Sequence, residues 1–174
     1  DQKVRDARKL KSGDKVPGKI ISIFAGKGGI GKTTLAVNLA MALASRPDIQ
    51  VAVVDLNVQF GDVALTLNVF PRSTIADIVA EKGQLEDRML AAYMTVYNDR
   101  LHVLAAPLRP EQAEKVTGKL VGGVLQQLRN SYDFIIVDTV ASFSELTIAA
   151  LDASDKVLVL TALDLPTVKN TKLA

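Results

Sequence analysis

The stretch KIISIFAGKGGIGKTT, residues 19–34, decides the fold of this chain. It begins with an apolar run, passes through four glycines within six residues, and continues into a second apolar-rich segment. An apolar run without polar alternation is typical of a strand buried on both faces of a parallel sheet. Glycines tolerate positive φ angles and close backbone approach, as a tight loop requires. The stretch therefore predicts a buried strand, a glycine-rich loop and a helix.

The glycine loop, residues 26–31, matches two phosphate-binding patterns. As G-x-G-x-x-G it fits a dinucleotide-binding turn, with Asp55 at the distance of a ribose-binding acid. As G-x-x-x-x-G-K-T it fits a P-loop, in which a lysine contacts the β- and γ-phosphates and a hydroxyl binds Mg²⁺. Lys32 and Thr33 favour the P-loop, because a dinucleotide fold has no use for either residue there. We therefore predict that ATP or ADP and Mg²⁺ bind here. The predicted ATP-binding residues are Gly26, Lys27, Gly28, Gly29, Ile30, Gly31, Lys32, Thr33 and Thr34.

Strand and helix patterns alternate along the rest of the chain. Further apolar runs occupy residues 50–55, 101–106, 132–138 and 156–162. Helical patterns cover residues 33–45, 74–81, 110–129 and 144–151, the second opened by a Thr74–Asp77 capping box. This alternation predicts an α/β fold of the P-loop NTPase type, with a mostly parallel, doubly wound sheet flanked by helices on both faces.

An aspartate closes the apolar run IIVD at Asp138. A carboxylate at the carboxyl end of a parallel strand lies beside the phosphate-binding loop, where it can hold Mg²⁺ through water. Thr33, Asp138 and Asp55 are the predicted metal residues.

Composition indicates one compact domain. The chain has 174 residues, of which 48% are hydrophobic, and no cysteine, which excludes disulfides and thiolate metal sites. No apolar run approaches the about 20 residues that cross a bilayer. Residues 1–19 hold seven basic and three acidic residues. The remaining chain, residues 20–174, holds 14 basic and 16 acidic residues, so this body of the protein is nearly neutral. We interpret residues 1–19 as a basic linker and residues 20–174 as the nucleotide-binding domain.

The motif KGGIGKTT resembles the deviant P-loop of the ParA/MinD ATPases, whose mark is a lysine directly before the paired glycines. Lys27 lies at that position, VVDLN (53–57) at the family's second acidic motif, and Asp138 at its metal-proximal aspartate. The segments QFGDVALTLN (59–68), APLRPEQAE (106–114) and LDLPTVKNTK (163–172) are most similar to the CpaE/TadZ subgroup, which helps to place pilus assembly machinery at the bacterial envelope. The resemblance implies a receiver-like domain ahead of the linker and further strands beyond residue 173.

The resemblance also implies a mechanism. In the family the signature lysine reaches the partner's phosphates across a nucleotide-sandwiched homodimer, so Lys27 would offset phosphate charge in trans. The implied function is a Mg-ATP-dependent, dimerising switch ATPase with a protein partner in envelope pilus or secretion machinery. The implied location is the cytoplasm, with peripheral recruitment to the inner membrane or the cell pole. Lys27, Lys32, Asp55 and Asn57 are the predicted catalytic residues.

One position departs from the family pattern. The second acidic motif normally reads D-x-D, but here it reads Asp55-Leu56-Asn57. An amide holds a water by hydrogen bonding but cannot accept its proton as a carboxylate does. Loss of a positioned base slows a reaction by a factor on the order of 10²–10⁴, so we predict slow hydrolysis with ATP binding intact. Two explanations of Asn57 stay open: it is an engineered substitution that slows hydrolysis, or it is a natural residue and another group positions the water. Asp55 is the remaining carboxylate near the metal, and Asp62 is a weaker candidate.

Two other functions fit the same motifs. A ParA-type partition ATPase binds DNA non-specifically through clustered lysines and arginines, which the nearly neutral body disfavours. A nucleotide-binding scaffold without hydrolysis fits Asn57. Among the remaining polar features, we interpret His102 as structural and Arg109 as an exposed loop residue, and we leave Phe60 open between core and partner-facing positions.

Overall fold

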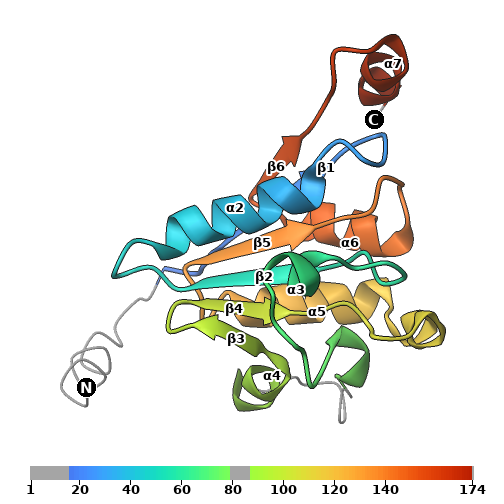
Figure 1. Ribbon diagram of the computed structural model, residues 1–174. Helices are drawn as coiled ribbons and strands as arrows, with labels where there is room; N and C mark the ends of the chain where they lie inside the picture. The colour runs from blue at the N-terminus through green and yellow to red at the C-terminus, as the bar shows by residue number, and fades with distance from the viewer. Residues whose placement is uncertain (1–15, 79–86, 174) are drawn as a thin grey trace.

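The computed structural model describes residues 16–78 and 87–173, which form a sheet covered by helices on both faces (Figure 1). The strands follow the order β3-β4-β2-β5-β1-β6 across the sheet. Five of them are parallel: β1 (Lys19–Phe24), β2 (Val51–Asp55), β4 (Leu101–Leu104), β5 (Phe134–Asp138) and β6 (Lys156–Val159). Each lies within a predicted apolar run. The predicted fold class, a mostly parallel doubly wound sheet, is confirmed.

The sixth strand is antiparallel and was not predicted from the hydrophobic pattern. β3 (Thr95–Asn98) pairs with β4 at the edge of the sheet. The hairpin turn is held by Asn98, whose Oδ1 accepts hydrogen bonds from the backbone N–H groups of Arg100 and Leu101, both at 2.9 Å. Asparagine stabilises turns by such local bonds. A short strand with three exposed residues has too weak a hydrophobic pattern to be recognised alone.

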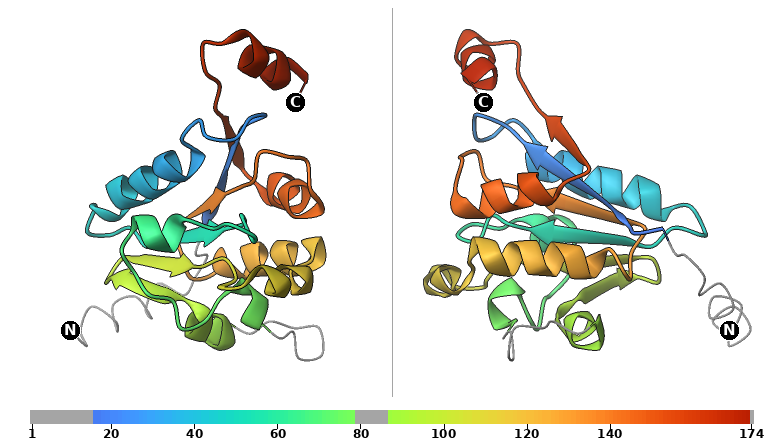
Figure 2. Two further views of the ribbon diagram at one scale, coloured as in Figure 1. Left: turned by 45° about the vertical axis from the view of Figure 1, so that its right-hand side comes forward. Right: turned by 180° about the vertical axis from the view of Figure 1, so that it is seen from behind.

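Helices cover the two faces of the sheet and bury separate cores. On one face lies α2 (Lys32–Ala44), with the short α3 (Val63–Thr66) beside it. The other face carries α5 (Gly118–Leu128) and α6 (Glu145–Ala153), as Figure 2 shows from behind, while α4 (Asp87–Tyr93) lies toward the β3 edge. Strands β2 and β5 are buried on both faces, which explains why their sequences do not alternate.

The predicted helix over residues 110–129 is wrong as one element. Pro110–Lys115 forms a 3₁₀ helix, Val116 is extended, and α5 begins only after Thr117. The Thr117 hydroxyl accepts a hydrogen bond from the Leu120 N–H at 3.2 Å, so it caps a new helix. Val116 is buried in the core, and this anchor bends the chain between the two segments.

The predicted helix over residues 74–81 is also shorter than expected. Asp77 Oδ2 accepts hydrogen bonds from both the backbone N–H and the hydroxyl of Thr74, so the predicted capping box between these two residues is present. Only a 3₁₀ turn, Ile75–Asp77, follows, and Ile78 is extended. Residues 79–81 lie outside the described part of the chain, as do residues 1–15 of the predicted linker.

The carboxyl ends of β1, β2 and β5 lie side by side and set the position of the site. Asp138 pairs in register with Ile23 and Asp55. The chain leaves β6 toward α7 (Leu165–Leu173), which stands at the same end as the glycine loop (Figure 1). Within residues 16–78 and 87–173, no helix combines the length and apolarity needed to span a bilayer.

Candidate nucleotide-binding site

The glycine loop turns sharply between β1 and α2. Gly29 and Gly31 have φ angles of 75° and 93°, a region that side-chain-bearing residues rarely adopt. A Cβ built on Gly28, Gly29 or Gly31 meets no atom within 4 Å, so the loop borders open space. Gly31 directly precedes α2, and the first residues of this helix, Lys32, Thr33 and Thr34, line this space. A helix N-terminus attracts anions through its unpaired N–H groups and partial positive charge.

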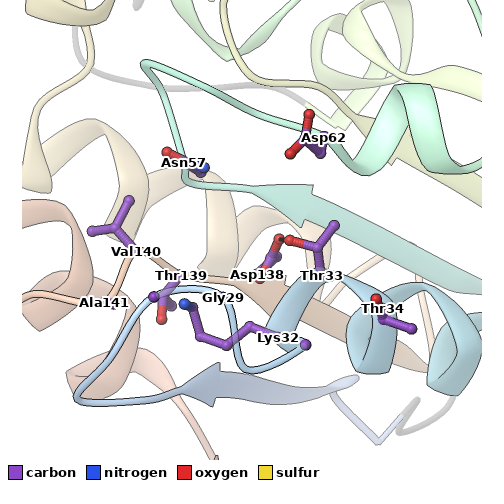
Figure 3. Close-up of a pocket in the computed structure, with 12 residues that line it drawn as sticks. Gly29, Lys32, Thr33, Thr34, Asn57, Asp62, Asp138, Thr139, Val140 and Ala141 are labelled. Carbon is purple, nitrogen blue, oxygen red and sulfur yellow. Dashed lines mark hydrogen bonds between the residues drawn. The ribbon is translucent and has the colours of Figure 1, made fainter.

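A cavity of about 420 Å³ opens between this loop and the segments after β2 and β5 (Figure 3). Lys32 extends along one side of it toward Thr139, while Asn57 and Asp62 lie on the opposite side. The lining residues are Gly28, Gly29, Gly31, Lys32, Thr33, Thr34, Asn57, Asp62, Asp138, Thr139, Val140 and Ala141. The fold thus brings the predicted loop residues and Asp138 together.

Thr33 and Asp138 meet at the inner end of the cavity. The Thr33 hydroxyl donates a hydrogen bond to Asp138 Oδ2 at 2.5 Å. Asp138 is 1% exposed, and its Oδ1 has no hydrogen-bond partner among the described residues. Burial raises the pKa of Asp138 against the lowering effects of the Thr33 hydrogen bond and the Lys32 charge, and the charge of Asp62 raises it further. A buried carboxylate oxygen without a donor has unsatisfied capacity to bind a cation or its waters.

These residues fit a magnesium ion. Mg²⁺ prefers oxygen ligands and keeps several waters, with one or two carboxylates and substrate phosphates completing its shell. Thr33 would offer its hydroxyl oxygen directly, and Asp138 would offer Oδ1 to a metal-bound water. In residues 16–78 and 87–173, no three His, Cys, Asp or Glu side chains gather closely enough to hold a metal by themselves. The arrangement therefore suits a hydrated ion shared with phosphates.

Asp55 is not among the residues that line this cavity. It is 1% exposed, and its two oxygens accept hydrogen bonds from the backbone N–H groups of Asn57 (3.0 Å) and Val63 (3.1 Å). Burial raises its pKa to about 7, although these two hydrogen bonds lower it and the charge of Asp138 adds to the increase. The structure thus does not place Asp55 among the lining residues, and its visible role is to hold the loop after β2.

Asn57 lines the cavity, but its amide group also has a structural contact. The Nδ2 atom donates to the Phe60 carbonyl oxygen at 2.6 Å. A carboxylate cannot donate this bond, so asparagine suits the turn as it stands. The assignment of Asn57 to the hydrolytic water stays a prediction.

Lys27 lies outside the cavity of its own chain. Its Nζ is 3.5 Å from Asp164 Oδ1, on the loop before α7, and both side chains are almost half exposed. Asp164 also accepts from the N–H and hydroxyl of Thr167, and these contacts lower its pKa together with the charge of Lys27. An exposed ion pair of this kind is weak, so Lys27 is available to another partner. Gly26 and Ile30 also lie outside the lining, and Asn170 of α7 donates to the Gly26 carbonyl at 3.2 Å.

Several lining residues were not predicted. Thr139, Val140 and Ala141 follow Asp138 directly, and the buried Thr139 hydroxyl donates to the Ile23 carbonyl at 2.7 Å. Proximity in sequence to a strand-end aspartate was the available signal. Asp62, which the sequence placed among the weaker candidates, lines the cavity as well.

The remaining polar and aromatic candidates lie elsewhere. His102 Nδ1 lies 2.8 Å from the Tyr132 hydroxyl, with the two rings edge to face, and burial lowers its pKa. Arg109 is exposed before the 3₁₀ helix, and Phe60 is 73% exposed. Phe60 is therefore not a core residue.

A parallel sheet whose strand ends hold a glycine loop, Lys32, Thr33 and Asp138 around one cavity defines a P-loop NTPase fold. A family model described as an AAA domain matches residues 18–169. The chain belongs to this family and, within it, to the P-loop ATPases of the ParA and MinD type.

Among curated relatives, the sporulation initiation inhibitor Soj of Bacillus subtilis is 34% identical over 151 residues, covering 82% of this chain and 57% of Soj. The antiactivator FleN of Pseudomonas aeruginosa is 28% identical over 154 residues, covering 87% of this chain and 52% of FleN. The chain spans about half the length of the curated relatives it matches.

Solved structures share the fold. A ParA family ATPase from Chlorobium tepidum TLS has a TM-score of 0.81 and 26% identity, covering 87% of this chain and 64% of that protein. The cell division ATPase MinD of Pyrococcus furiosus has a TM-score of 0.76 and 29% identity, and the match covers 88% of this chain and 63% of that protein. MinD of Pyrococcus horikoshii, solved as a complex with Mg-ADP, has a TM-score of 0.71 and 24% identity, covering 88% and 61%.

Proposed function

We propose that this protein is a Mg-ATP-dependent, dimerising switch ATPase that positions a pilus or secretion assembly at the cell envelope. The observation that carries the nucleotide part is the convergence of Lys32, Thr33 and the unpaired Oδ1 of Asp138 on one cavity beside the α2 N-terminus. A positive side chain, a hydroxyl and a buried carboxylate at this spacing suit a nucleotide phosphate chain with a divalent cation.

Each residue has a separate role in binding. The Lys32 ammonium would neutralise the terminal phosphates, and the N–H groups of the glycine loop and the first turn of α2 would donate to phosphate oxygens. Thr33 and Asp138 would hold Mg²⁺, and the bound ion would offset negative charge on the phosphates during their transfer. The 2.5 Å hydrogen bond between Thr33 and Asp138 already orients both oxygens before the ion binds.

Hydrolysis of ATP to ADP and phosphate is proposed to be slow. Asn57 lies on the cavity side opposite Lys32, where it would orient a water without accepting its proton (Figure 3). The hydrogen bond from its Nδ2 to Phe60 further restricts the amide group. A slow reaction suits a switch, because the ATP-bound state then lasts long enough to engage a partner.

Dimerisation is proposed to use Lys27. Two copies that meet at their ATP sites bring several negative charges together, and this repulsion requires added cations. Lys27 is exposed and does not line its own cavity, and its one ion pair within residues 16–78 and 87–173 is the weak contact with Asp164. It would leave Asp164 and contact the phosphates of the facing copy.

The envelope role rests on the resemblance of residues 59–68, 106–114 and 163–172 to the CpaE/TadZ subgroup. We propose a cytoplasmic protein that reaches the inner membrane or the cell pole through a protein partner of the pilus or secretion machinery. The exposure of Phe60, in the same loop as Asn57, supports this proposal, because an exposed aromatic side chain can contact a partner.

The test compares nucleotide binding with mass in solution. Calorimetry with ATP and Mg²⁺ is expected to detect binding by the wild type and by Lys27→Ala but not by Lys32→Ala. Light scattering is expected to give a dimer with ATP and a monomer with ADP for the wild type, and a monomer throughout for Lys27→Ala. Lys27→Ala is the matched control, since it removes a lysine from the same loop. Unchanged ATP binding by Lys32→Ala would contradict the binding role, and an unchanged ATP dimer in Lys27→Ala would contradict the trans role.

A non-hydrolysing scaffold is the second candidate, and it is favoured by the amide at Asn57. Phosphate release separates the two functions. Turnover that depends on Lys32 supports the ATPase, whereas ATP-dependent dimerisation without any phosphate release supports the scaffold.

A further inference from the structure

The loop between β2 and α3 carries a carboxylate, Asp62, that faces the cavity opposite Lys32 (Figure 3). We propose that Asp62 is a second acidic group for the metal: together with Asp138 it holds the water shell of the Mg²⁺ ion that accompanies ATP. This inference rests on the proposed nucleotide-binding function and adds a positioning residue to it.

The loop is held in place at both ends. Asp55 Oδ1 accepts from the Asn57 N–H at 3.0 Å, and Asp55 Oδ2 accepts from the Val63 N–H at 3.1 Å. The Asn57 amide closes the turn on the Phe60 carbonyl at 2.6 Å. The buried Asp55 side chain thus holds both ends of the loop, at Asn57 and at Val63. Asp62 directly precedes Val63 in the chain.

Close packing at Gly61 restricts the loop further. A Cβ at Gly61 would overlap the Ala106 side chain and would lie 2.5 Å from Asp55 Oδ2. The backbone therefore passes against the ends of β2 and β4 with no room for a side chain. This packing holds the backbone next to Asp62, whose exposed side chain lies among the residues that line the cavity.

The carboxylate of Asp62 does not cap the helix that follows it. Asp62 is the N-cap residue of α3, a position where aspartate normally accepts a backbone hydrogen bond, but its side chain makes none. Its backbone carbonyl accepts from the N–H and hydroxyl of Thr66 at 2.8 and 2.7 Å. Across residues 16–78 and 87–173, no hydrogen bond or ion pair involves its carboxylate oxygens.

Asp62 and Asp138 face the same space, and their charges repel. Burial is the main reason that the pKa of Asp138 is raised, and the nearby charge of Asp62 raises it further. The buried Asp138 Oδ1 has no donor, so two acidic groups border a cavity in which the described residues provide only Lys32 as a charged counterpart. A divalent cation between them removes this repulsion.

The contact to the metal is expected to pass through water. Among the described residues, no three His, Cys, Asp or Glu side chains group closely enough to hold a metal ion by themselves, and Mg²⁺ retains several of its waters in proteins. Carboxylates that accept from metal-bound waters typically change metal affinity by about 10–100-fold when they are removed. Asp62 would therefore tune the Mg²⁺ requirement of nucleotide binding.

The test is a Mg²⁺ titration at fixed concentration of a fluorescent ATP analogue. We expect Asp62→Asn to raise the Mg²⁺ concentration at half-maximal binding by about tenfold relative to the wild type. Affinity for the nucleotide without Mg²⁺ is expected to stay equal or to increase, because a negative charge near the phosphates is removed. Asp152→Asn on the exposed side of α6 is the matched control and is expected to behave as the wild type.

A second variant protects the test against a folding defect. Asp62→Ser keeps a residue that favours helix N-caps but removes the carboxylate, and we expect the same shift with thermal unfolding close to that of the wild type. The inference would be overturned if, in both variants, the Mg²⁺ concentration at half-maximal binding stayed within about twofold of the wild-type value. An equal loss of affinity with and without Mg²⁺ would also overturn it, since Asp62 would then act on the loop. In this titration, failure of the proposed nucleotide binding has a different result: the wild type would then bind no nucleotide at any Mg²⁺ concentration.

Discussion

The buried carboxyl group of Asp55 should contribute to stability by holding the β2–α3 loop. Asp55→Ala removes the acceptor of the Asn57 N–H and of the buried Val63 N–H. Each buried donor left without a partner costs about 1–3 kcal/mol, and the Asn57 N–H is the less buried of the two donors. We therefore expect Asp55→Ala to lower the free energy of unfolding by roughly 2–4 kcal/mol. Asp55→Asn keeps one acceptor oxygen and should lose about half as much.

The pH dependence of this loss has a definite sign. Burial raises the pKa of Asp55 to about 7, above its ordinary value of 3.8. A carboxyl group with a raised folded-state pKa binds its proton more tightly in the folded chain, so its contribution is full below about pH 4 and declines as the pH rises through 7. The difference between the wild type and Asp55→Ala should therefore be larger at pH 5 than at pH 8.

Urea unfolding at both pH values measures this difference. Asp152→Ala on the exposed face of α6 is the control for removal of an acidic residue. If the free energy of unfolding of Asp55→Ala stays within about 0.5 kcal/mol of the wild-type value, as it does for surface substitutions, Asp55 does not hold the loop. If the loss grows from pH 5 to pH 8, the assigned pKa direction is wrong.

Three further predictions concern other parts of the chain. Asn57→Asp should raise phosphate release at least about tenfold, because a carboxylate can accept the proton of the attacking water; unchanged turnover would refute the account of slow hydrolysis. Thr117→Ala should lower the free energy of unfolding by about 1 kcal/mol through loss of the α5 N-cap, which urea unfolding checks, and an unaltered midpoint would contradict the cap. Desolvation raises the pKa of Asp155, but the Ile20 N–H and Arg129 outweigh it and the pKa is lowered. Its stabilising effect is thus present above about pH 4 and is lost as the pH falls further, so Asp155→Asn should flatten the acid limb of a stability profile, and an identical acid limb would count against the contact.

Sequence patterns predicted the strands better than the helices. β2, β5 and the last three residues of β1 are buried on both faces of the sheet, and such strands have nearly continuous apolar sequences. The segment from Pro110 to Arg129 was predicted as one helix because Pro110 followed by Glu111 is typical of a first helical turn. The break at Val116 and Thr117 arises because Val116 is anchored in the core and Thr117 caps α5, and both are tertiary or capping effects that propensity does not include.

The loop after β2 illustrates what the candidate site needed from the structure. From the sequence, Asp55, Asn57 and Asp62 were three polar residues near a predicted strand end. The fold separates them: Asp55 points inward to backbone N–H groups, whereas Asn57 and Asp62 reach the cavity. Gly61 packs so closely against Ala106, a residue far away in the sequence, that a side chain at position 61 would overlap it, and the sequence does not reveal this proximity.

The sequence by itself determined the buried parallel strands, the glycine loop with Lys32 and Thr33, and the strand-end Asp138, because each is encoded in residues that are neighbours along the chain. Tertiary structure alone decided that Asp138 keeps an unpaired oxygen beside Thr33, that Lys27 pairs with Asp164, and that Asp62 rather than Asp55 lines the cavity. The physical reason is that the direction and pairing of a polar side chain depend on donors and on packing from other strands and loops, which only the folded chain brings together.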